Sequence, residues 1–182
     1  MTLAPPVTYT AATGNFLTAS LWNAQVRDSN NYFSAPPCFR AHSETSMSLL
    51  DNTWVTLNLE TEEFDNYGGH STTTNTSRYT VQVSGIYLVQ GIAAFAGNST
   101  KNRAARILLN GSAYHGTFVK LLAADVSGSS AIATAAMIPA NVGDYIELQA
   151  YQNSGTANPG LGTSATTGDV APSMSCLWVS NQ

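Results

Sequence analysis

One segment of this chain alternates so regularly that it fits one backbone conformation. Residues 144–151 read Asp-Tyr-Ile-Glu-Leu-Gln-Ala-Tyr, which places Ile146, Leu148 and Ala150 on one side and larger or polar residues on the other. A period of two is that of a half-buried antiparallel strand. Comparable apolar segments separated by polar Gly/Asn/Ser loops recur from Cys38 to the end of the chain. We therefore predict an all-β, antiparallel domain.

The pattern predicts roughly eight to ten short strands, as in a sandwich, barrel or jelly roll. The strongest local signal is Asn110-Gly111, which is typical of a tight hairpin. Residues 153–168 are rich in Gly, Thr, Ala and Ser, so we expect an exposed, mobile loop there. The strands are expected at residues 38–43, 54–59, 64–72, 78–83, 85–96, 105–109, 130–138, 144–152 and 173–180.

The composition is polar but nearly uncharged. Charged residues make up 10% of the chain, against about 25% in ordinary domains. The net charge is −4 and no run of Lys or Arg occurs, which argues against nucleic acid as the partner. We also expect no secretory signal and no membrane-spanning segment, because no apolar run is long enough. Assembly in a cytoplasm is the expectation that follows.

Two cysteines, Cys38 and Cys176, are too few for a disulfide framework. Each lies within an apolar segment that we predict to be a strand. Two buried free thiols suit a reducing compartment. A disulfide between the first and last strands of the domain remains open as the alternative.

The N-terminal part differs from the rest of the chain. Residues 1–16 are polar, contain proline and are expected to be extended. Thr18 has the side chain of a helix N-cap, and the apolar residues after it recur at helical spacing. We predict a short amphipathic helix from Ala19 to Asn31, ended by Pro36-Pro37. This divides the chain into an arm with a helix (1–37) and a β domain (38–182).

A helix of this length is marginal in water unless something covers its apolar side. The sequence leaves three coverings open: the chain's own domain, the same helix from other copies, or another protein. The apolar residues concerned are Leu21, Trp22, Val26 and Phe33.

Several predicted strands are apolar on both faces. In the last strand Met174, Cys176 and Trp178 point one way, while Leu177 and Val179 point the other. A sheet with one solvated face alternates more cleanly than this. Burial on both sides implies a second contact surface, and subunit association is its simplest source.

Five short motifs, in order, resemble the jelly roll of the complement globular heads and the tumour necrosis factor superfamily. One departure is the last strand, Met174-Ser-Cys-Leu-Trp178, where the family has Phe-x-Gly-Phe-Leu. The resemblance covers residues 38–182 and implies a jelly-roll sandwich that forms a homotrimer. The motifs are Phe39-Arg-Ala41, Asn66-Tyr-Gly-Gly69, Arg78-Tyr-Thr-Val-Gln-Val-Ser-Gly-Ile-Tyr87 (in which Gly85 and Tyr87 match the family), Leu109-Asn-Gly111 and Val142-Gly-Asp-Tyr-Ile-Glu-Leu148.

On this resemblance we predict which apolar face of the sheet lines the three-fold axis. We choose the face that carries Met174, Cys176 and Trp178, together with Tyr87 and Phe39. Replacement of Trp178 by Asp is then expected to disrupt the trimer.

The predicted helix carries a second resemblance. Residues 18–28, Thr-Ala-Ser-Leu-Trp-Asn-Ala-Gln-Val-Arg-Asp, are similar to a segment near the start of many virion proteins of tailed phages that infect actinobacteria. The resemblance implies a phage structural protein with a docking segment ahead of its jelly roll. The residues expected to dock on the particle are Leu17, Leu21, Trp22, Val26 and Arg27.

The sequence shows no recognisable arrangement of residues for catalysis or metal binding. His42, His70 and His115 are scattered without metal-ligand spacing, and neither a nucleophile elbow nor a phosphate-binding loop occurs. We therefore predict no enzymatic activity and no cofactor. The three basic residues Lys101, Arg103 and Arg106 are expected to form a polar strand end, with pairing to a neighbouring subunit as the alternative.

One acidic cluster occurs, at Glu60, Glu62, Glu63 and Asp65. We expect a solvated loop at these residues. A calcium site is the minor alternative, suggested by the complement-like resemblance, although calcium needs six or more oxygens from a shaped loop.

Together these observations predict a homotrimeric virion protein that decorates and stabilises a phage capsid through its N-terminal arm. Its partners would be copies of itself and the major capsid protein or tail proteins. It would be assembled in the host bacterial cytoplasm and would reside on the virion surface. The alternative is a tail-tip or fibre adhesin whose loops (153–168, 127–130 and 98–102) bind host cell-surface glycan.

Overall fold

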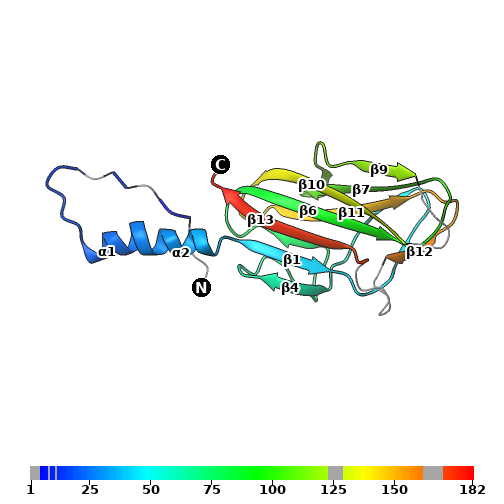
Figure 1. Ribbon diagram of the computed structural model, residues 1–182, viewed down its shortest axis with the longest axis horizontal. Coiled ribbons are helices and arrows are strands. Elements are labelled where there is room, and N and C mark those ends of the chain that lie inside the picture. Colours follow the sequence, from blue (N-terminus) through cyan, green and yellow to red (C-terminus); the bar gives the residue numbers. More distant parts are fainter. Residues whose placement is uncertain (1–4, 8, 11, 123–128, 162–169) are drawn as a thin grey trace.

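The computed structural model describes residues 5–182 except 8, 11, 123–128 and 162–169. It has two parts: a β sandwich and a helix that projects from one end of it (Figure 1). No described helix has the length and hydropathy needed to cross a bilayer.

The helix runs from Ala19 to Ser34, three residues beyond the predicted end at Asn31. It consists of α1 (Ala19–Trp22), a π-helical segment η1 (Asn23–Arg27) and α2 (Asp28–Ser34). The predicted N-cap is confirmed, because Thr18 Oγ1 accepts a hydrogen bond from the backbone N–H of Leu21 at 3.1 Å. Pro36 and Pro37 follow directly and prevent its continuation.

Five antiparallel strands form one layer, here called the front sheet. In order across the sheet they are β10 (Ser130–Ala140), β6 (Gly85–Phe95), β13 (Ser173–Ser180), β1 (Cys38–His42) and β4 (Thr61–Asp65). Neighbours in the sheet are distant in sequence, as expected of a Greek-key or jelly-roll topology.

The other layer, here called the back sheet, closes the sandwich. Its strands are β5 (Arg78–Thr80), β11 (Tyr145–Gln152), β7 (Asn102–Leu109) and β8 (Ser112–Ala113), with β9 (Val119–Leu122) also paired to β7. A small sheet of β12 (Asn158–Leu161) and β2 (Met47–Leu49) lies apart, and β3 (Thr53–Thr56) runs beside β11.

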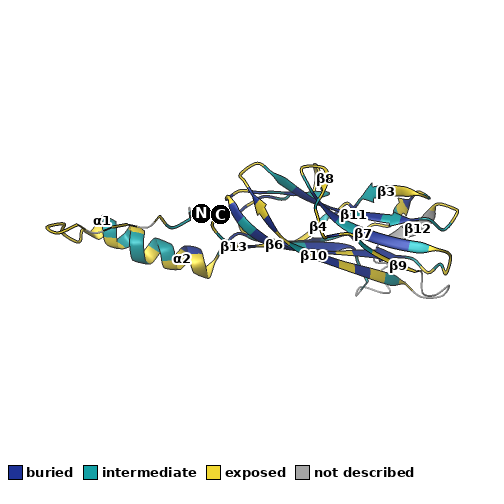
Figure 2. Cartoon of the chain, turned by 90° about the horizontal axis from the view of Figure 1, so that it is seen from above, coloured by how far each residue is buried: buried dark blue, intermediate teal, exposed yellow. Residues whose placement is uncertain are grey.

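The core lies between the two sheets, which Figure 2 shows as stacked layers. Ile146, Leu148 and Ala150 of β11 are fully buried, which confirms the face predicted from the period of two. Tyr87 and Phe39 face them from the front sheet side and are also fully buried. The predicted all-β jelly-roll fold is thus confirmed.

The Asn-Gly and Gly-Asp motifs of the family resemblance contact each other at one end of the back sheet. Asn110 Nδ2 donates to Asp144 Oδ1 at 2.8 Å, and Asn110 Oδ1 accepts from the backbone N–H of Tyr145 at 2.9 Å. Asn110 adopts a positive φ of 52°, as the predicted Asn-Gly turn requires. The Asn-Gly and Gly-Asp motifs therefore form one structural unit that joins β7 to β11.

A third motif, which ends with Gly85-Ile-Tyr87, shapes the end of the core nearest the helix. A Cβ atom at Gly85 would overlap the indole nitrogen of Trp178, so only glycine fits there. That indole nitrogen donates to the carbonyl of Ser84 at 3.2 Å, and Tyr87 donates its hydroxyl to the carbonyl of Val83 at 2.7 Å. Trp178, a large residue that departs from the family pattern, thus fits because Gly85 has no side chain.

The predicted strand at 64–72 is wrong, because β4 ends at Asp65. The Asp65 carboxylate accepts hydrogen bonds from the backbone N–H groups of Tyr67, Gly68 and His70, and these bonds turn the chain away from the sheet. A side chain on Gly69 would overlap Thr80 and Tyr79, which explains the second glycine.

Four short strands were missed by the sequence pattern: β2, β8, β9 and β12. Each has two to four residues, which is too short for an alternating pattern to stand out. β12 lies inside the predicted loop at 153–168, so that prediction is wrong for its four residues. Residues 162–168 of the same prediction lie outside the described residues.

Candidate functional site and interaction surfaces

The five residues predicted to line a three-fold axis lie inside the sandwich. Phe39 and Tyr87 are fully buried, and Met174, Cys176 and Trp178 are at most 5% exposed within a single chain. A neighbouring subunit has almost nothing left to cover on these side chains. The assignment of this face to a subunit interface is therefore corrected: it packs against the back sheet.

The opposite face of the front sheet, which points away from the core, is an apolar surface that the chain leaves uncovered. Its residues line up in rows, because paired residues of neighbouring strands point to the same side. One row is apolar across four strands and is called the apolar row: Met137 of β10, Leu88 of β6, Leu177 of β13 and Cys38 of β1.

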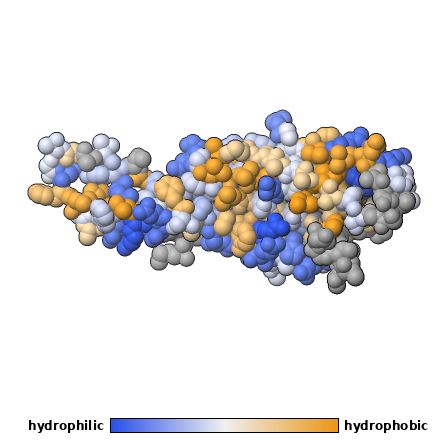
Figure 3. Space-filling view, viewed as in Figure 1, coloured by the Kyte–Doolittle hydropathy of each residue, from blue (hydrophilic) through white to orange (hydrophobic). Residues whose placement is uncertain are grey.

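The apolar row is well exposed in one chain. Met137, Leu177 and Leu88 have exposed fractions of 55%, 42% and 37%, and Val179 beside them has 44%. Figure 3 looks onto this face, and hydrophobic residues gather in the half nearer to the helix and again toward the far end of the sandwich. A contiguous apolar patch on a β sheet is typical of a protein contact.

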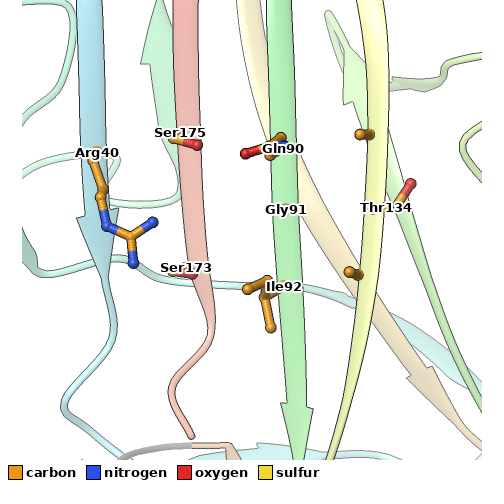
Figure 4. A pocket seen from close by; sticks show the side chains of 9 residues that line it. Arg40, Gln90, Gly91, Ile92, Thr134, Ser173 and Ser175 are labelled. Carbon is orange, nitrogen blue, oxygen red and sulfur yellow. The ribbon is translucent and has the colours of Figure 1, made fainter. Parts of the chain in front are cut away.

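The next row along the same strands is polar and is called the polar row: Ala135, Gln90, Ser175 and Arg40. Together with Ile92 and Ser173 it lines a shallow hollow of about 260 Å³, shown in Figure 4. Arg40 closes one side, with its Nε 2.9 Å from Glu63 Oε2. The face therefore combines an apolar band with hydrogen-bonding groups, as specific interfaces do.

A second exposed apolar group lies along one side edge of the sandwich, where β9 runs beside β10. Phe118, Leu121 and Leu122 are 59%, 52% and 78% exposed. The edge group belongs to the back sheet, because β9 pairs with β7, whereas the apolar row belongs to the front sheet. Two different patches can form a head-to-tail contact, and such contacts close into rings when the rotation allows it.

Four of the five residues predicted to dock on a particle lie together. Leu17, Leu21, Trp22 and Val26 line a groove of about 300 Å³ between the arm and the helix, with Tyr9 and Phe16 on the arm side. We call it the helix groove. The fifth residue, Arg27, is not among its lining residues; its Nε lies 2.8 Å from Asp28 Oδ1.

The helix is fixed to the sandwich by its last turn. Tyr32 is fully buried and meets Trp178 edge to face, with ring centroids 4.9 Å apart. Asn66 holds the linker, since its Nδ2 donates to the Pro36 carbonyl at 2.7 Å and its Oδ1 accepts from the backbone N–H of Cys38 at 2.8 Å. The apolar pattern of the sequence did not single out Tyr32 as this anchor.

The acidic cluster is not a solvated loop, because three of its four residues lie on β4. Each carboxylate has protein partners. Glu62 faces His70, Glu63 faces Arg40 and His42, and Asp65 accepts backbone N–H groups. Within the described residues, no group of three or more His, Cys, Asp or Glu side chains is arranged to hold a metal ion.

Glu60 belongs to the same cluster, and hydrogen bonds stabilise its charged carboxylate. Burial by itself raises the pKa of Glu60, but hydrogen bonds from Thr45, its own backbone and Ser43 outweigh burial and lower it overall. The shortest of these bonds is 2.6 Å, from the backbone N–H of Thr45 to Oε1. The carboxylate therefore fixes the turn after β1.

The three basic residues do not form a cluster. Arg103 is buried and donates to the carbonyls of Asn98, Thr100 and Asn102, which fixes that loop, and burial lowers its pKa. Arg106 points to the other side of β7, where its guanidinium lies 4.0 Å above the ring of Trp54. The loop at 98–102 is thus held by Arg103, whereas residues 127–128 and 162–168 of the other two loops proposed for glycan contact lie outside the described residues.

The two cysteines are free and lie on opposite faces of the front sheet. Cys38 pairs with Leu177 and Cys176 pairs with Phe39, so Cys38 lies in the apolar row and Cys176 in the core. Successive residues of a strand point to opposite sides, so the two sulfurs face away from each other. Burial raises the pKa of both thiols.

No protein-family model and no curated protein matches this sequence. Solved structures do match its fold. The globular domain of the zebrafish complement 1qA protein has a TM-score of 0.58 at 11% identity, covering 80% of this chain and 99% of that one.

Two structures of the tumour necrosis factor family match the fold with similar TM-scores. The Eiger TNF of S. frugiperda has a TM-score of 0.55 at 12% identity, covering 80% of this chain and 94% of that one. Murine APRIL has a TM-score of 0.52 at 14% identity, covering 78% and 98%. The chain therefore has the jelly-roll fold of complement and tumour necrosis factor domains, which are not enzymes.

Proposed function

We propose that this protein is a homotrimeric surface protein of a tailed phage particle, which docks through residues 1–37 and decorates and stabilises the capsid. One observation carries the proposal: the chain leaves apolar surfaces uncovered in both of its parts, the apolar row and the edge group on the sandwich and the helix groove on the arm. A protein that binds both its own copies and a particle needs two such surfaces.

The trimer contact is assigned to the outward face of the front sheet. The complement-like resemblance implies three copies, and the apolar row supplies a band that one chain cannot bury by itself. The edge group of Phe118, Leu121 and Leu122 is the proposed counterpart on the neighbouring copy. When this contact between two different patches is repeated three times, it closes a ring in which no apolar row and no edge group is left without a partner.

The docking contact is assigned to the helix groove. The phage assignment rests on the resemblance of residues 18–28, and the structure collects Leu17, Leu21, Trp22 and Val26 from this region into one groove. Three grooves per trimer would bind a regular particle together, so weak single contacts add to a strong attachment. Neither surface needs a catalytic group, and we assign the protein no enzymatic activity.

The trimer is tested by the mass of the protein in solution, measured by light scattering behind a sizing column. The unchanged protein is expected to have the mass of three chains, and Leu177→Asp to have the mass of one chain with an unchanged circular dichroism spectrum. Val142→Asp, at a 64% exposed loop position, is the matched control and should stay trimeric. A monomeric unchanged protein would refute the trimer.

Docking is tested by sedimenting the protein with purified phage particles that lack it. Leu21→Asp together with Trp22→Asp should abolish co-sedimentation while the trimer mass is kept. Asn30→Asp, at an exposed polar position of the same helix, should bind as the unchanged protein does. Binding to isolated tails but not to capsids would move the protein to the tail.

A second candidate, a glycan-binding adhesin, is favoured by one cluster beside the back sheet. The rings of Trp54 and Tyr151 lie 5.3 Å apart, and Tyr151 donates its hydroxyl to Asn52 Oδ1 at 3.1 Å. Aromatic rings beside polar side chains suit a sugar. A glycan array should then give hits that Trp54→Ala removes, and an array without hits would eliminate this candidate.

A further inference from the structure

We propose that the helices of the three copies pack together, with Ser29 and Phe33 on the packed side, and form a short stalk between the jelly rolls and the docking groove. This inference rests on the proposed trimer. It names a second partner surface, on α2, whose occupant is the same helix of another copy. Four observations support it, taken in order from the sandwich outward.

The helix leaves the sandwich at the proposed interface. Cys38, the first residue of β1, belongs to the apolar row, and the helix ends at Ser34, four residues earlier. In the proposed ring each apolar row meets the edge group of the next copy, so the three helix ends, each four residues from a row, are arranged around the same axis. Figure 2 shows the helix continuing the layer of the front sheet rather than that of the back sheet.

The direction of the helix is set by fixed contacts. Tyr32 is buried against Trp178, and the carbonyl of Pro37 accepts the backbone N–H of Trp178 at 2.9 Å. Asn66 binds both sides of this linker. The helix therefore projects along the long axis of the molecule (Figure 1), and three copies related by a rotation axis would project side by side.

The helix needs a cover that its own chain does not supply. Phe33 directly follows the buried Tyr32, yet it is 63% exposed. Residues 28–34 include two Asn and two Ser, which are weak helix formers, so a single helix of this composition is marginal in water. Burial of three Phe33 rings against one another would stabilise it.

The charges on the helix allow identical copies to lie together. Its two charged residues are Arg27 and Asp28, which pair with each other at 2.8 Å, so the helix has no net charge. Ser29, four residues before Phe33, lies on the same side and is small enough for close approach. The helix groove lies toward the other end, so bundling at Phe33 leaves it open for docking.

The experiment introduces single cysteines into the full chain with Cys38 replaced by Ser, while the buried Cys176 is kept. Phe33→Cys and Ser29→Cys should each give covalent dimers under mild oxidation, up to about two-thirds of the chains, because one of three cysteines stays unpaired. Asn31→Cys is the matched control. It lies about 200° around the helix from Phe33, and should give none.

The outcomes separate this inference from the proposed trimer when the mass of each variant is measured in solution. A trimer in which both Phe33→Cys and Ser29→Cys cross-link and Asn31→Cys does not would support the stalk. A trimer without these cross-links, or with equal cross-linking at Asn31→Cys, would overturn the stalk and leave the trimer intact. A monomer would overturn both.

Discussion

Both faces of the front sheet are apolar, but one is buried in the core of the chain and the other is exposed. The face toward the back sheet carries Phe39, Tyr87 and Trp178, all buried within one chain. The face away from it carries Met137, Leu88 and Leu177, all more than one-third exposed. Hydrophobicity therefore does not distinguish them.

The two faces differ in the size and shape of their residues. Aromatic residues fill the core, where Phe39 and Tyr79 stack with centroids 4.9 Å apart and Tyr32 meets Trp178. The outward face has aliphatic residues in register and no aromatic in the apolar row. A flat aliphatic band suits a partner that arrives as a preformed surface, whereas interlocking aromatics suit residues that fold around each other.

The largest expected effect comes from the core side. Trp178→Ala should lower the free energy of unfolding by about 3–5 kcal/mol, because a buried ring is removed and its cavity stays. Urea denaturation of the monomeric Leu177→Asp background measures this without the trimer. Trp178→Asp should prevent folding altogether, rather than merely separate subunits as the sequence predicted. A loss below about 1 kcal/mol would mean that this face is not the core.

A smaller loss is expected at the glycine that accommodates Trp178. Gly85→Ala should cost about 1–3 kcal/mol of unfolding free energy, because the added Cβ overlaps the indole. In the double variant with Trp178→Ala the overlap with the indole is gone, whereas that with the Ser180 carbonyl oxygen at 2.6 Å stays, so the two losses should add only in part. Strict additivity in urea denaturation would show that Gly85 is required for another reason.

The two native cysteines report on the two faces and need no replacement themselves. In the trimer neither thiol should react with a water-soluble maleimide, since Cys176 is in the core and Cys38 is covered by the neighbour. In monomeric Leu177→Asp, Cys38 alone should react, and slowly, because its pKa is raised. Mass spectrometry counts the adducts. Fast labelling of Cys38 in the unchanged trimer would place the interface elsewhere.

The smallest expected effect is on pH dependence. The pKa of Glu60 is lowered below its ordinary value of 4.5, so its carboxylate stabilises the folded state above that pH. This stability is lost as pH falls below 4.5, since the folded state then binds fewer protons than the unfolded state. Glu60→Gln should flatten that part of the curve of unfolding free energy against pH. An unchanged slope would assign the acid sensitivity to other carboxylates, such as Asp144.

Much of the fold was predictable from sequence because its signals are local. The alternation of β11, the Asn110-Gly111 turn and the Thr18 cap each depend on residues close together in the chain, and each was confirmed. The strand predicted at 64–72 failed because a single side chain, Asp65, binds three backbone N–H groups and ends β4. Such hydrogen bonds cannot be predicted from the alternation of apolar and polar residues.

The candidate surfaces were predictable in part. Helical spacing selected Leu21, Trp22 and Val26, and these line one groove. The interface residues were placed on the wrong face, and the anchor Tyr32 was not noticed. The first error arose because the sequence shows that a strand has two apolar faces, but not which face another sheet covers. The second arose because helical spacing does not show which helix residue meets Trp178.

The sequence by itself determined the strand-rich class, the helix with its start, and the excess of apolar surface over what one sandwich can bury. These follow from residue spacing and backbone preference, which act over a few residues. Only the tertiary structure decided which face became the core, where the two cysteines point and how Trp178 joins the helix to the sandwich. Those choices depend on contacts between Gly85, Tyr32 and Trp178, residues up to about 150 positions apart, and such contacts exist only after the chain has folded.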